Sequence, residues 1–327
     1  MKNLLSRFWM LWSAMALATT CAWGQSQVPS TIKIITPFTV GTGYDTAARA
    51  VGNRLAEKWG TSVIVQNMPG ASGNIGTDAA AKAAPDGATL LMGGNTMLIS
   101  SQIYKNVPFH PLKDLAPVSL VATGTLMLVA HPKLGVQNVA ELLRLAKSKP
   151  GQVNFGSPGL GTPHHMAMEL FNMETQTNML HVPYRGTSGY IQDLLGGEIM
   201  TGFLPVHVAQ GFIRSGKLTA LAVGSPKRHP VAADVPTLIE LGYKNIDVDL
   251  WYAFFVPAKT PASYVAQLQA EIAAILREPG VRDVLNKGGM DARSTTSEEL
   301  GEMAQKDYVR WGQVIRNRSE EHTSELQ

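Results

Sequence analysis

The stretch TPFTVGTGYDTAAR, Thr36–Arg49, decides how the rest of the chain is interpreted. It follows the apolar run Ile32–Ile35 and leads into a segment whose apolar residues have helical spacing. A strand, a glycine-containing loop and a helix in that order are typical of an anion-binding turn. Glycine lets backbone N–H groups turn toward a ligand, and the helix presents its positive end to the same spot. The simplest structural role for Asp45 in this turn is that of the helix N-cap.

A nucleotide is not the anion that this loop predicts. The dinucleotide fingerprint requires G-x-G-x-x-G/A, but Thr46 stands at the third position after Gly41 and Gly43. The next expected strand ends at Asn67 without the acidic residue that would bind a ribose, and no P-loop pattern occurs. The loop therefore predicts a generic anion site.

Three more loops repeat the order of strand, turn and helix. They are NFGSPGLGTPHHMAMEL (154–170), where Thr162 should cap a helix beginning at Pro163, HVPYRGTSGYIQDLLGG (181–197), and NMPGASGN (67–74). The carboxyl ends of parallel strands are where ligands bind in open sheets. With two such loops in each of two lobes, we expect helix N-termini to hold a carboxylate through uncharged donors.

Apolar runs bounded by turn residues alternate with segments of helical spacing along most of the chain. Expected strands are 32–37, 62–66, 89–92, 127–130, 153–156, 179–182, 200–204 and 218–223. Expected helices are 46–59, 76–84, 139–147, 163–173, 188–195, 208–215, 262–276, 279–287 and 297–315, the last with Ser297 as N-cap. This order predicts an α/β fold with mostly parallel sheets and helices on both faces. We expect lobe 1 to comprise residues 28–126 plus 250–317, lobe 2 residues 127–249, and the chain to cross twice at a hinge.

The two ends of the chain are expected to lie outside this fold. Residues 1–24 combine positive charge, a short apolar run and small residues before Gly24, which is typical of a secretory signal peptide and predicts a periplasmic location. Cys21, the single cysteine, falls in this segment, so the exported protein should contain neither a disulfide nor a thiol nucleophile. Residues 318–327 (RSEEHTSELQ) match the translation of a common sequencing-adapter DNA, so we expect a different native C-terminus.

Several other functions are disfavoured by particular residues. The formal net charge is only +3 and no basic run occurs, so nucleic acid is not an expected partner. A nucleophilic serine at Ser157 lacks the glycine two residues earlier, and Pro158 removes the N–H of an oxyanion hole. His164 and His165 point about 100° apart on a helix, so surface or rim histidines are expected rather than a metal site. Arg185 has two open roles, a partner for a ligand carboxylate or a tether to Asp193.

Long segments of the chain resemble one family, the Bug-type periplasmic solute-binding receptors of tripartite tricarboxylate transporters. The segments are PFTVGTGYDTAAR, VQNMPGASGNIGTDAAAKAAPDGATLLMG, FHPLKDLAPVSLVA, VNFGSPGLGTPHHMAMELF, HVPYRGTSGYIQDLLGGEI, RHPVAADVPTLIELGY and WYAFFVPAKTP, which together span nearly all of residues 31–316. The resemblance implies two α/β lobes that close like a flytrap on a carboxylated ligand. It also implies contacts from backbone amides, short hydroxyls and water.

The ligand contacts that the resemblance implies come from both lobes. They are Phe38, Gly41, Thr42, Gly43, Asp45, Asn67, Ala71, Ser72, Ser157, Gly161, Thr162, His164, Tyr184 and Phe203. Gly-Thr-Gly and Tyr44 depart from the usual PFPPGG-x-x-D loop, and Glu198 stands where an aspartate is common, so no particular acid is implied.

The function implied by the resemblance is capture of a small organic carboxylate and its delivery to integral-membrane transporter subunits. A monomer without catalysis, cofactor or metal is expected. An exported α/β hydrolase and a sensor subunit that presents its ligand to a signalling partner remain alternatives.

Overall fold

The computed structural model describes residues 28–324, with side chains to residue 317, so the expected signal peptide lies outside the described part. Its ten-stranded sheet has the order β2-β1-β3-β9-β4-β7-β5-β6, and β8 and β10 both pair with β4. The strands are β1 Thr31–Thr36, β2 Ser62–Asn67, β3 Thr89–Gly94, β4 Leu115–Ala130, β5 Asn154–Ser157, β6 Leu180–Pro183, β7 Thr201–Pro205, β8 Thr219–Val223, β9 Asp249–Pro257 and β10 Asp291–Ala292.

Helices cover this sheet along its whole length. They are α2 Gly43–Trp59, α3 Asn74–Ala81, α4 Asn95–Ile103, α5 Val139–Ser148, α6 Pro163–Thr175, α7 Thr187–Gly196, α8 Val206–Arg214, α9 Ala262–Ile275, α10 Pro279–Lys287 and α11 Ser297–Ser324. A 3-10 turn, η1 Ala71–Gly73, precedes α3. None of the helices described here is long and apolar enough to cross a membrane.

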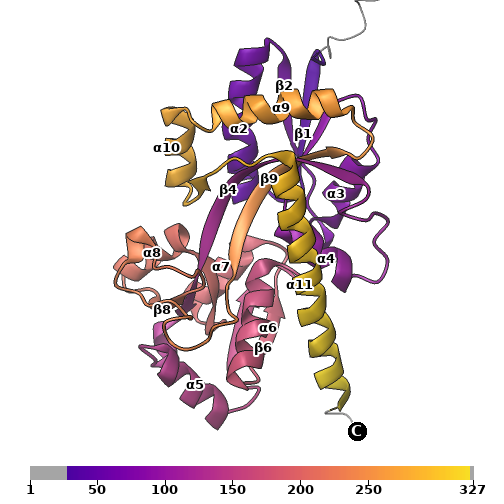
Figure 1. Ribbon diagram of the computed structural model, residues 1–327. Coiled ribbons are helices and arrows are strands. Elements are labelled where there is room, and N and C mark those ends of the chain that lie inside the picture. The colour runs from indigo at the N-terminus through magenta and orange to yellow at the C-terminus, as the bar shows by residue number, and fades with distance from the viewer. Residues whose placement is uncertain (1–27, 325–327) are drawn as a thin grey trace, which may run out of the picture.

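The long strand β4 belongs to both lobes (Figure 1). From Leu115 to Thr125 it pairs with β9, and from Leu126 to Ala130 it pairs with β7 and β8. Lobe 1 therefore contains β1, β2, β3, β9 and β10, and lobe 2 contains β5 to β8. The chain returns to lobe 1 where Val248 N donates to Gly224 O and Asp249 pairs with Thr125. We propose limits at 126/127 and 249/250 for the lobes, which this change of partner supports.

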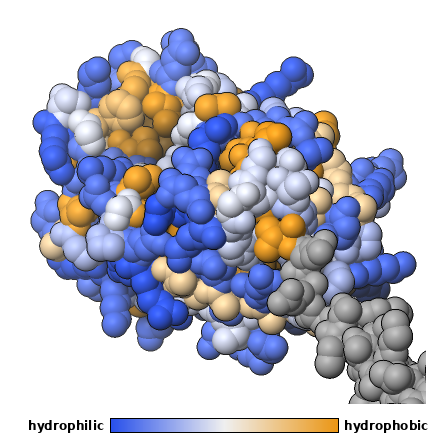
Figure 2. All heavy atoms as spheres, turned by 90° about the horizontal axis from the view of Figure 1, so that it is seen from above, coloured by the Kyte–Doolittle hydropathy of each residue, from blue (hydrophilic) through white to orange (hydrophobic). Residues whose placement is uncertain are grey.

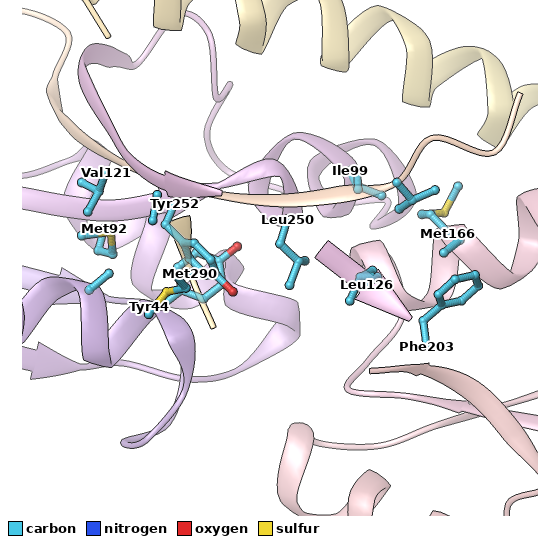
Figure 3. Packing of buried hydrophobic residues seen from close by; sticks show 14 of the residues in the cluster. Tyr44, Met92, Ile99, Val121, Leu126, Met166, Phe203, Leu250, Tyr252 and Met290 are labelled. Atoms are coloured by element: carbon cyan, nitrogen blue, oxygen red, sulfur yellow. The ribbon is translucent and has the colours of Figure 1, made fainter. Parts of the chain in front are cut away.

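Apolar side chains form a continuous core through the crossing. The cluster includes Tyr44 and Met92 in lobe 1, Leu126 and Leu250 at the crossing, and Met166 in lobe 2. Figure 3 shows these side chains in a row that follows the crossing strands. Because both lobes contribute to one apolar cluster, their packing is coupled at the hinge.

The α/β, two-lobe prediction is confirmed, but the sheet is more mixed than expected. The pairs β1–β2, β1–β3, β5–β6 and β5–β7 are parallel. Every pair that involves β4 is antiparallel, as is β3–β9, because β4 and β9 run in opposite directions between the lobes. The helix α4 was not predicted from the sequence, and α11 continues to Ser324, beyond the predicted end at residue 315.

Both predicted aspartate and serine N-caps were wrong. The first helix begins at Gly43, so Thr42 is at the N-cap position and Asp45 lies inside the first turn. At α11 the cap is Thr296, because Glu299 N donates to Thr296 Oγ1 while Thr296 N donates to Glu299 Oε2. This reciprocal pair is a capping box. Ser297 instead donates to Val118 O and ties α11 to β4.

Candidate ligand-binding site

The first loop is held in shape by the buried carboxylate of Asp45. Gly41 N donates to Asp45 Oδ2 at 3.0 Å, and Arg49 Nε and Asn67 Nδ2 each donate to Oδ1 at 3.0 Å. Burial by itself would raise the pKa of Asp45, but these hydrogen bonds outweigh it and lower the pKa below its ordinary value. Asp45 therefore fixes the conformation of the loop through Gly41 and forms an ion pair with Arg49. The arginine neutralises the charge of the carboxylate.

Three aromatic rings support the same loop. Phe38 stacks on Tyr44 with ring centroids 4.4 Å apart, and Tyr44 meets Tyr252 edge-on at 4.8 Å. A Cβ atom on Gly43 would lie only 2.6 Å from Tyr252 Oη, so this position requires glycine for the close approach. At Gly41 glycine is favoured for another reason, because the backbone φ of 83° is in the left-handed region. The Gly-Thr-Gly sequence and the bulky Tyr44 thus belong to one packing arrangement.

The loop 67–74 is joined to the first loop through Asn67. Its amide donates to Thr36 Oγ1, Phe38 O and Asp45 Oδ1. Ala71 and Ser72 both have positive φ within the 3-10 turn η1, which leads into α3. Ala71 is exposed at the tip of the loop. The two loops of lobe 1 therefore form one unit.

In lobe 2 the loop 157–162 leads into α6. Thr162 caps this helix as predicted, accepting from His165 N, and Pro163 is its first residue. Ser157 is fully buried, and its hydroxyl lies 2.7 Å from His181 Nε2. Gly161 N donates to His165 Nδ1 at 3.2 Å, so the imidazole of His165 fixes the loop from inside.

The prediction that His164 and His165 are surface or rim residues was wrong. Both are buried, with 8% and 7% of their surface exposed. His165 stacks on His181, and its Nε2 lies 3.5 Å from Glu169 Oε1. Burial lowers the pKa of His164 to about 4, and neither of its ring nitrogens has a hydrogen-bond partner among the described residues. His164 is thus a neutral imidazole with a donor and an acceptor to offer.

The loop 184–187 packs on the loop 157–162. Tyr184 N donates to Ser157 O, and Gly186 N donates to Pro158 O. The Tyr184 hydroxyl donates to Asp193 Oδ2 at 2.6 Å, so Asp193 is engaged by Tyr184, and the tether between Arg185 and Asp193 that we had considered is not formed. Arg185 is exposed and makes no ion pair with any residue between 28 and 317. A role for Arg185 toward a ligand stays a prediction.

The two pairs of loops meet across the lobes. Ser72 Oγ of lobe 1 donates to Leu160 O of lobe 2 at 2.7 Å, and the same hydroxyl lies 3.2 Å from Tyr104 Oη. A Cβ atom on Gly159 would be 3.0 Å from Ser72 Oγ and 3.4 Å from Tyr184 O. The four glycine-containing loops therefore form one contiguous group between the lobes.

The helix α4 is a common neighbour of these loops, and the sequence analysis missed it. The Tyr44 hydroxyl lies 3.1 Å from Thr96 Oγ1, and Ser100 Oγ donates to Asn74 Oδ1. A Cβ atom on Gly161 would lie 3.2 Å from Ser100 Cα. The sequence does contain a signal for this helix. Gly93-Gly94 lies between an apolar strand and Asn95, just as glycines follow the apolar strands at the other four loops.

Further residues at the crossing were also missed. Asp249 begins β9, and Asn95 Nδ2 donates to its backbone oxygen at 2.7 Å. His207 of α8 packs on Gly289 of lobe 1 so closely that a Cβ atom there would lie 1.7 Å from His207 Nδ1. No local motif in the sequence marks these positions, since they depend on how the lobes meet.

Phe203 does not lie where we expected it. It was expected at a strand end that reaches the space between the lobes, but it has no exposed surface. It packs in the apolar core near Leu126 and Met166, as Figure 3 shows. The reason is that Phe203 pairs with Leu128 within β7, two residues before the strand ends at Pro205.

Helix N-termini around this group are open to an anion. No side chain caps α2, α3, α4 or α7, and glycine occupies the N-cap position of the last three. Unpaired first-turn N–H groups and the helix dipole together favour a negatively charged guest. No cluster that could hold a metal ion occurs among residues 28–324.

A groove of lobe 1 lies between α2 and α10, and it begins beside the first loop, since Asp45 and Thr46 are among its lining residues. Its walls include Arg49, Arg54, Glu278 and Val284. Arg54 pairs with Glu57 and Glu278, and Arg49 pairs with Asp45, so each charged side chain that lines this groove already has a partner. Seen from above, the outer face of lobe 1 carries apolar patches between polar side chains (Figure 2).

Two lobes joined by crossing strands, with amide-rich loops between them, define a periplasmic binding protein fold. A family model described as the tripartite tricarboxylate transporter family receptor matches residues 47–319. The chain belongs to this family of solute-binding receptors, and the resemblance seen in the sequence is confirmed.

Individual relatives agree with this assignment. BugT from Bordetella pertussis is 33% identical over 287 residues, which are 87% of this chain and 88% of BugT. The solved structure of R. palustris Rpa4515 with adipate has a TM-score of 0.82 at 27% identity, covering 88% of this chain and 96% of that one. MatC from Rhodopseudomonas palustris, solved with bound malate, has a TM-score of 0.81 at 28% identity, covering 87% and 98%.

Proposed function

We propose that this receptor captures a small organic carboxylate between its two lobes, at the contiguous group of loops 37–43, 67–74, 157–162 and 184–187. The observation that carries the proposal is the hydrogen bond from Ser72 Oγ to Leu160 O, which brings the amide-rich loops of both lobes together. Open N-termini at α2, α3, α4 and α7 surround the same place and supply neutral donors for a carboxylate.

The side chains offered to the ligand differ between the lobes. Lobe 1 contributes Thr42, Ser72 and the edge of Phe38, while Gly41, Gly43, Asp45 and Asn67 shape the loop that carries them. Lobe 2 contributes the backbone N–H of Leu160 and the unpartnered ring nitrogens of buried His164. Carboxylate ligands in related structures, adipate in Rpa4515 and malate in MatC, support this class of guest.

Export and delivery complete the proposed function. Residues 1–24 serve as the signal peptide, and the closed, ligand-bound receptor is recognised by integral-membrane transporter subunits. Membership of a transporter receptor family supports this partner. A ligand that contacts both lobes shifts the population toward the closed form by its differential affinity for the two states.

A thermal-shift panel of mono-, di- and tricarboxylates and aromatic acids tests the proposal. At a ligand concentration of about 100 times Kd, stabilisation is about 2.7 kcal/mol, which raises Tm by several degrees. At least one carboxylate class should raise Tm, and its uncharged amide analogue should not. If every acid in the panel leaves Tm unchanged, the proposed function fails.

The hydrolase alternative has its own test at Ser157. Its hydroxyl is close to His181, but Ser157 has no exposed surface and Pro158 follows it without an N–H. We expect no turnover of short-chain nitrophenyl esters above that of a heat-denatured sample. Turnover that is lost in Ser157→Ala would contradict the receptor proposal and favour an esterase.

A further inference from the structure

Two buried acceptor atoms at the lobe 1 side of the crossing lack donors. Asn95 Oδ1 and Asp249 Oδ1 are both buried and have no hydrogen-bond partner among the described residues. The Asn95 side chain is oriented by its own amide, because Nδ2 donates to Asp249 O at 2.7 Å. That contact fixes which atom of Asn95 is the oxygen and places it beside Asp249. An unsatisfied buried acceptor costs about 1–3 kcal/mol, so a donor is missing here.

These acceptors adjoin the proposed carboxylate site. Asn95 is the first residue of α4, whose N-terminus has no side-chain cap, and Thr96 beside it contacts the Tyr44 hydroxyl of the first loop. Asp249 pairs with Thr125 of β4, one residue before that strand changes its partners from lobe 1 to lobe 2. The two acceptors therefore lie where a ligand between the lobes would meet both α4 and the hinge.

The charge environment of Asp249 favours a donor that carries positive charge. Burial, together with the negative charges of Asp247 and Asp291, raises the pKa of Asp249 to about 7, although the Thr125 hydroxyl acts in the opposite direction. No cation contributes to this balance. A carboxyl group in this setting accepts a hydrogen bond readily and would be stabilised as an anion by an ammonium group.

We infer that Asn95 Oδ1 and Asp249 Oδ1 form an acceptor subsite for a hydroxyl or ammonium group next to the ligand's carboxylate. The carboxylate meets the open end of α4 while the neighbouring donor meets the two oxygens. This inference rests on the proposed function and narrows it, because the preferred ligand becomes a hydroxy acid or amino acid rather than an unsubstituted acid. A site built to accept such a hydrogen bond discriminates strongly against the analogue that lacks the donor.

Calorimetric titration with matched acids tests this inference. Succinate, malate and aspartate share one carbon chain, and butyrate, 2-hydroxybutyrate and 2-aminobutyrate share another. In at least one series the wild type should bind the hydroxy or amino member about 10-fold or more tightly than the unsubstituted acid. A preference for the amine over the hydroxyl, strengthening from pH 6 to pH 8, would identify ammonium as the donor.

Variants distinguish the loss of this subsite from a general loss of protein stability. Asp249→Ala and Asn95→Ala each remove one of the two acceptors, so each should reduce the preference for the donor-bearing acid to within about 3-fold, with little change in Kd for the unsubstituted acid. The control is Asp307→Asn, which alters another buried carboxyl of lobe 1 that already accepts from Trp251 Nε1 at 2.7 Å. It should leave the preference intact.

Equal binding within both series, or a preference that survives both variants, would overturn the subsite while leaving carboxylate capture standing. If no acid in the broad carboxylate panel binds the wild type, the proposed function fails and the subsite fails with it.

Discussion

Gly41 and Gly43 show how two neighbouring glycines meet different physical requirements. Gly41 adopts a positive φ of 83°, and a Cβ atom there would meet nothing within 4 Å. Gly43 has no such backbone requirement, but the Tyr252 hydroxyl occupies the space of its missing side chain. Substitution at Gly41 therefore introduces strain in the backbone, whereas substitution at Gly43 displaces the aromatic support of the loop.

We expect Gly43→Ala to lower Tm by several degrees and to weaken ligand binding about 10-fold or more. The added methyl group would lie 2.6 Å from Tyr252 Oη, and a buried ring can move away only by disturbing Tyr44. Gly211→Ala is the matched control, because Gly211 also lies in a helix and its Cβ atom would meet nothing within 4 Å. Better helix propensity should make the control neutral or stabilising. Equal effects of both variants would contradict the packing account.

The buried carboxyl of Asp249 should give the ligand-free protein a measurable pH dependence. Folded Asp249 keeps its proton to about pH 7, whereas the ordinary pKa of an aspartate is 3.8. Its contribution to the free energy of unfolding therefore falls as the pH rises from about 4 to about 7, and stays reduced above pH 7. Asp249→Asn removes this loss, so its Tm should exceed the wild-type Tm by at least about 2 °C at pH 8 and by much less at pH 5.

Scanning calorimetry at the two pH values measures this difference. Asp283→Asn is the control, because Asp283 is exposed on α10 and pairs only with Lys287 within its own helix. A Tm difference for Asp249→Asn that is the same at pH 5 and pH 8 would show that titration of this carboxyl is not the cause.

At the scale of elements, the fold is built from strand–loop–helix units whose loops converge. In the unit β5–α6 the loop 157–162 is fixed where it joins the helix, by the Thr162 cap and by the hydrogen bond from Gly161 N to His165 Nδ1. That bond exists only while His165 Nδ1 carries no proton. His165 is therefore a positioning residue for the amides of this loop.

His165→Ala should weaken carboxylate binding about 5- to 10-fold, because the loop 157–162 is then no longer held in one conformation. His165→Asn should restore much of the affinity, because the asparagine oxygen can take the place of Nδ1 as the acceptor for Gly161 N. Titration calorimetry with the best carboxylate from the panel measures both variants. If His165→Asn binds as weakly as His165→Ala, packing against His181 rather than the hydrogen bond is the function of His165.

Local chemistry explains what could be predicted from the sequence at this scale. Thr162 before Pro163, and glycines after apolar runs, mark helix starts and loops directly, so the four loops were found. The α4 helix escaped because it is buried on nearly all sides and shows little amphipathic pattern. Asp45 and Phe203 were misplaced because first-turn position and strand phase depend on tertiary packing. The joining of Asn95 to Asp249 links residues far apart in the chain, which no local pattern encodes.

At the scale of the whole molecule, affinity depends on how easily the lobes reach their closed arrangement. The hydrogen bond from Ser72 Oγ to Leu160 O crosses directly from one lobe to the other. This bond stabilises the closed form directly, in addition to the ligand contact that we propose for the same hydroxyl. A change in this bond therefore alters the population of the binding-competent state and the apparent Kd together.

Ser72→Ala should raise the apparent Kd about 5-fold and enlarge the radius of gyration of the ligand-bound protein measured by small-angle X-ray scattering. The matched control is Ser101→Ala, because Ser101 Oγ donates only to Leu98 O within α4. Ser101→Ala should change neither quantity. An unchanged Kd and radius in Ser72→Ala would mean that this bond does not hold the lobes together.

The unbroken course of β4 also has a consequence for folding. Lobe 2 draws its central strand from the same continuous segment that completes the sheet of lobe 1. An isolated 127–249 fragment keeps residues 127–130 of β4, which pair with β7 and β8, but it loses the apolar cluster that the two lobes share. We therefore expect the fragment to unfold at a lower temperature than the complete chain when both are followed by circular dichroism. The complete chain should lose structure in a single calorimetric transition, despite having the outward form of two separate bodies.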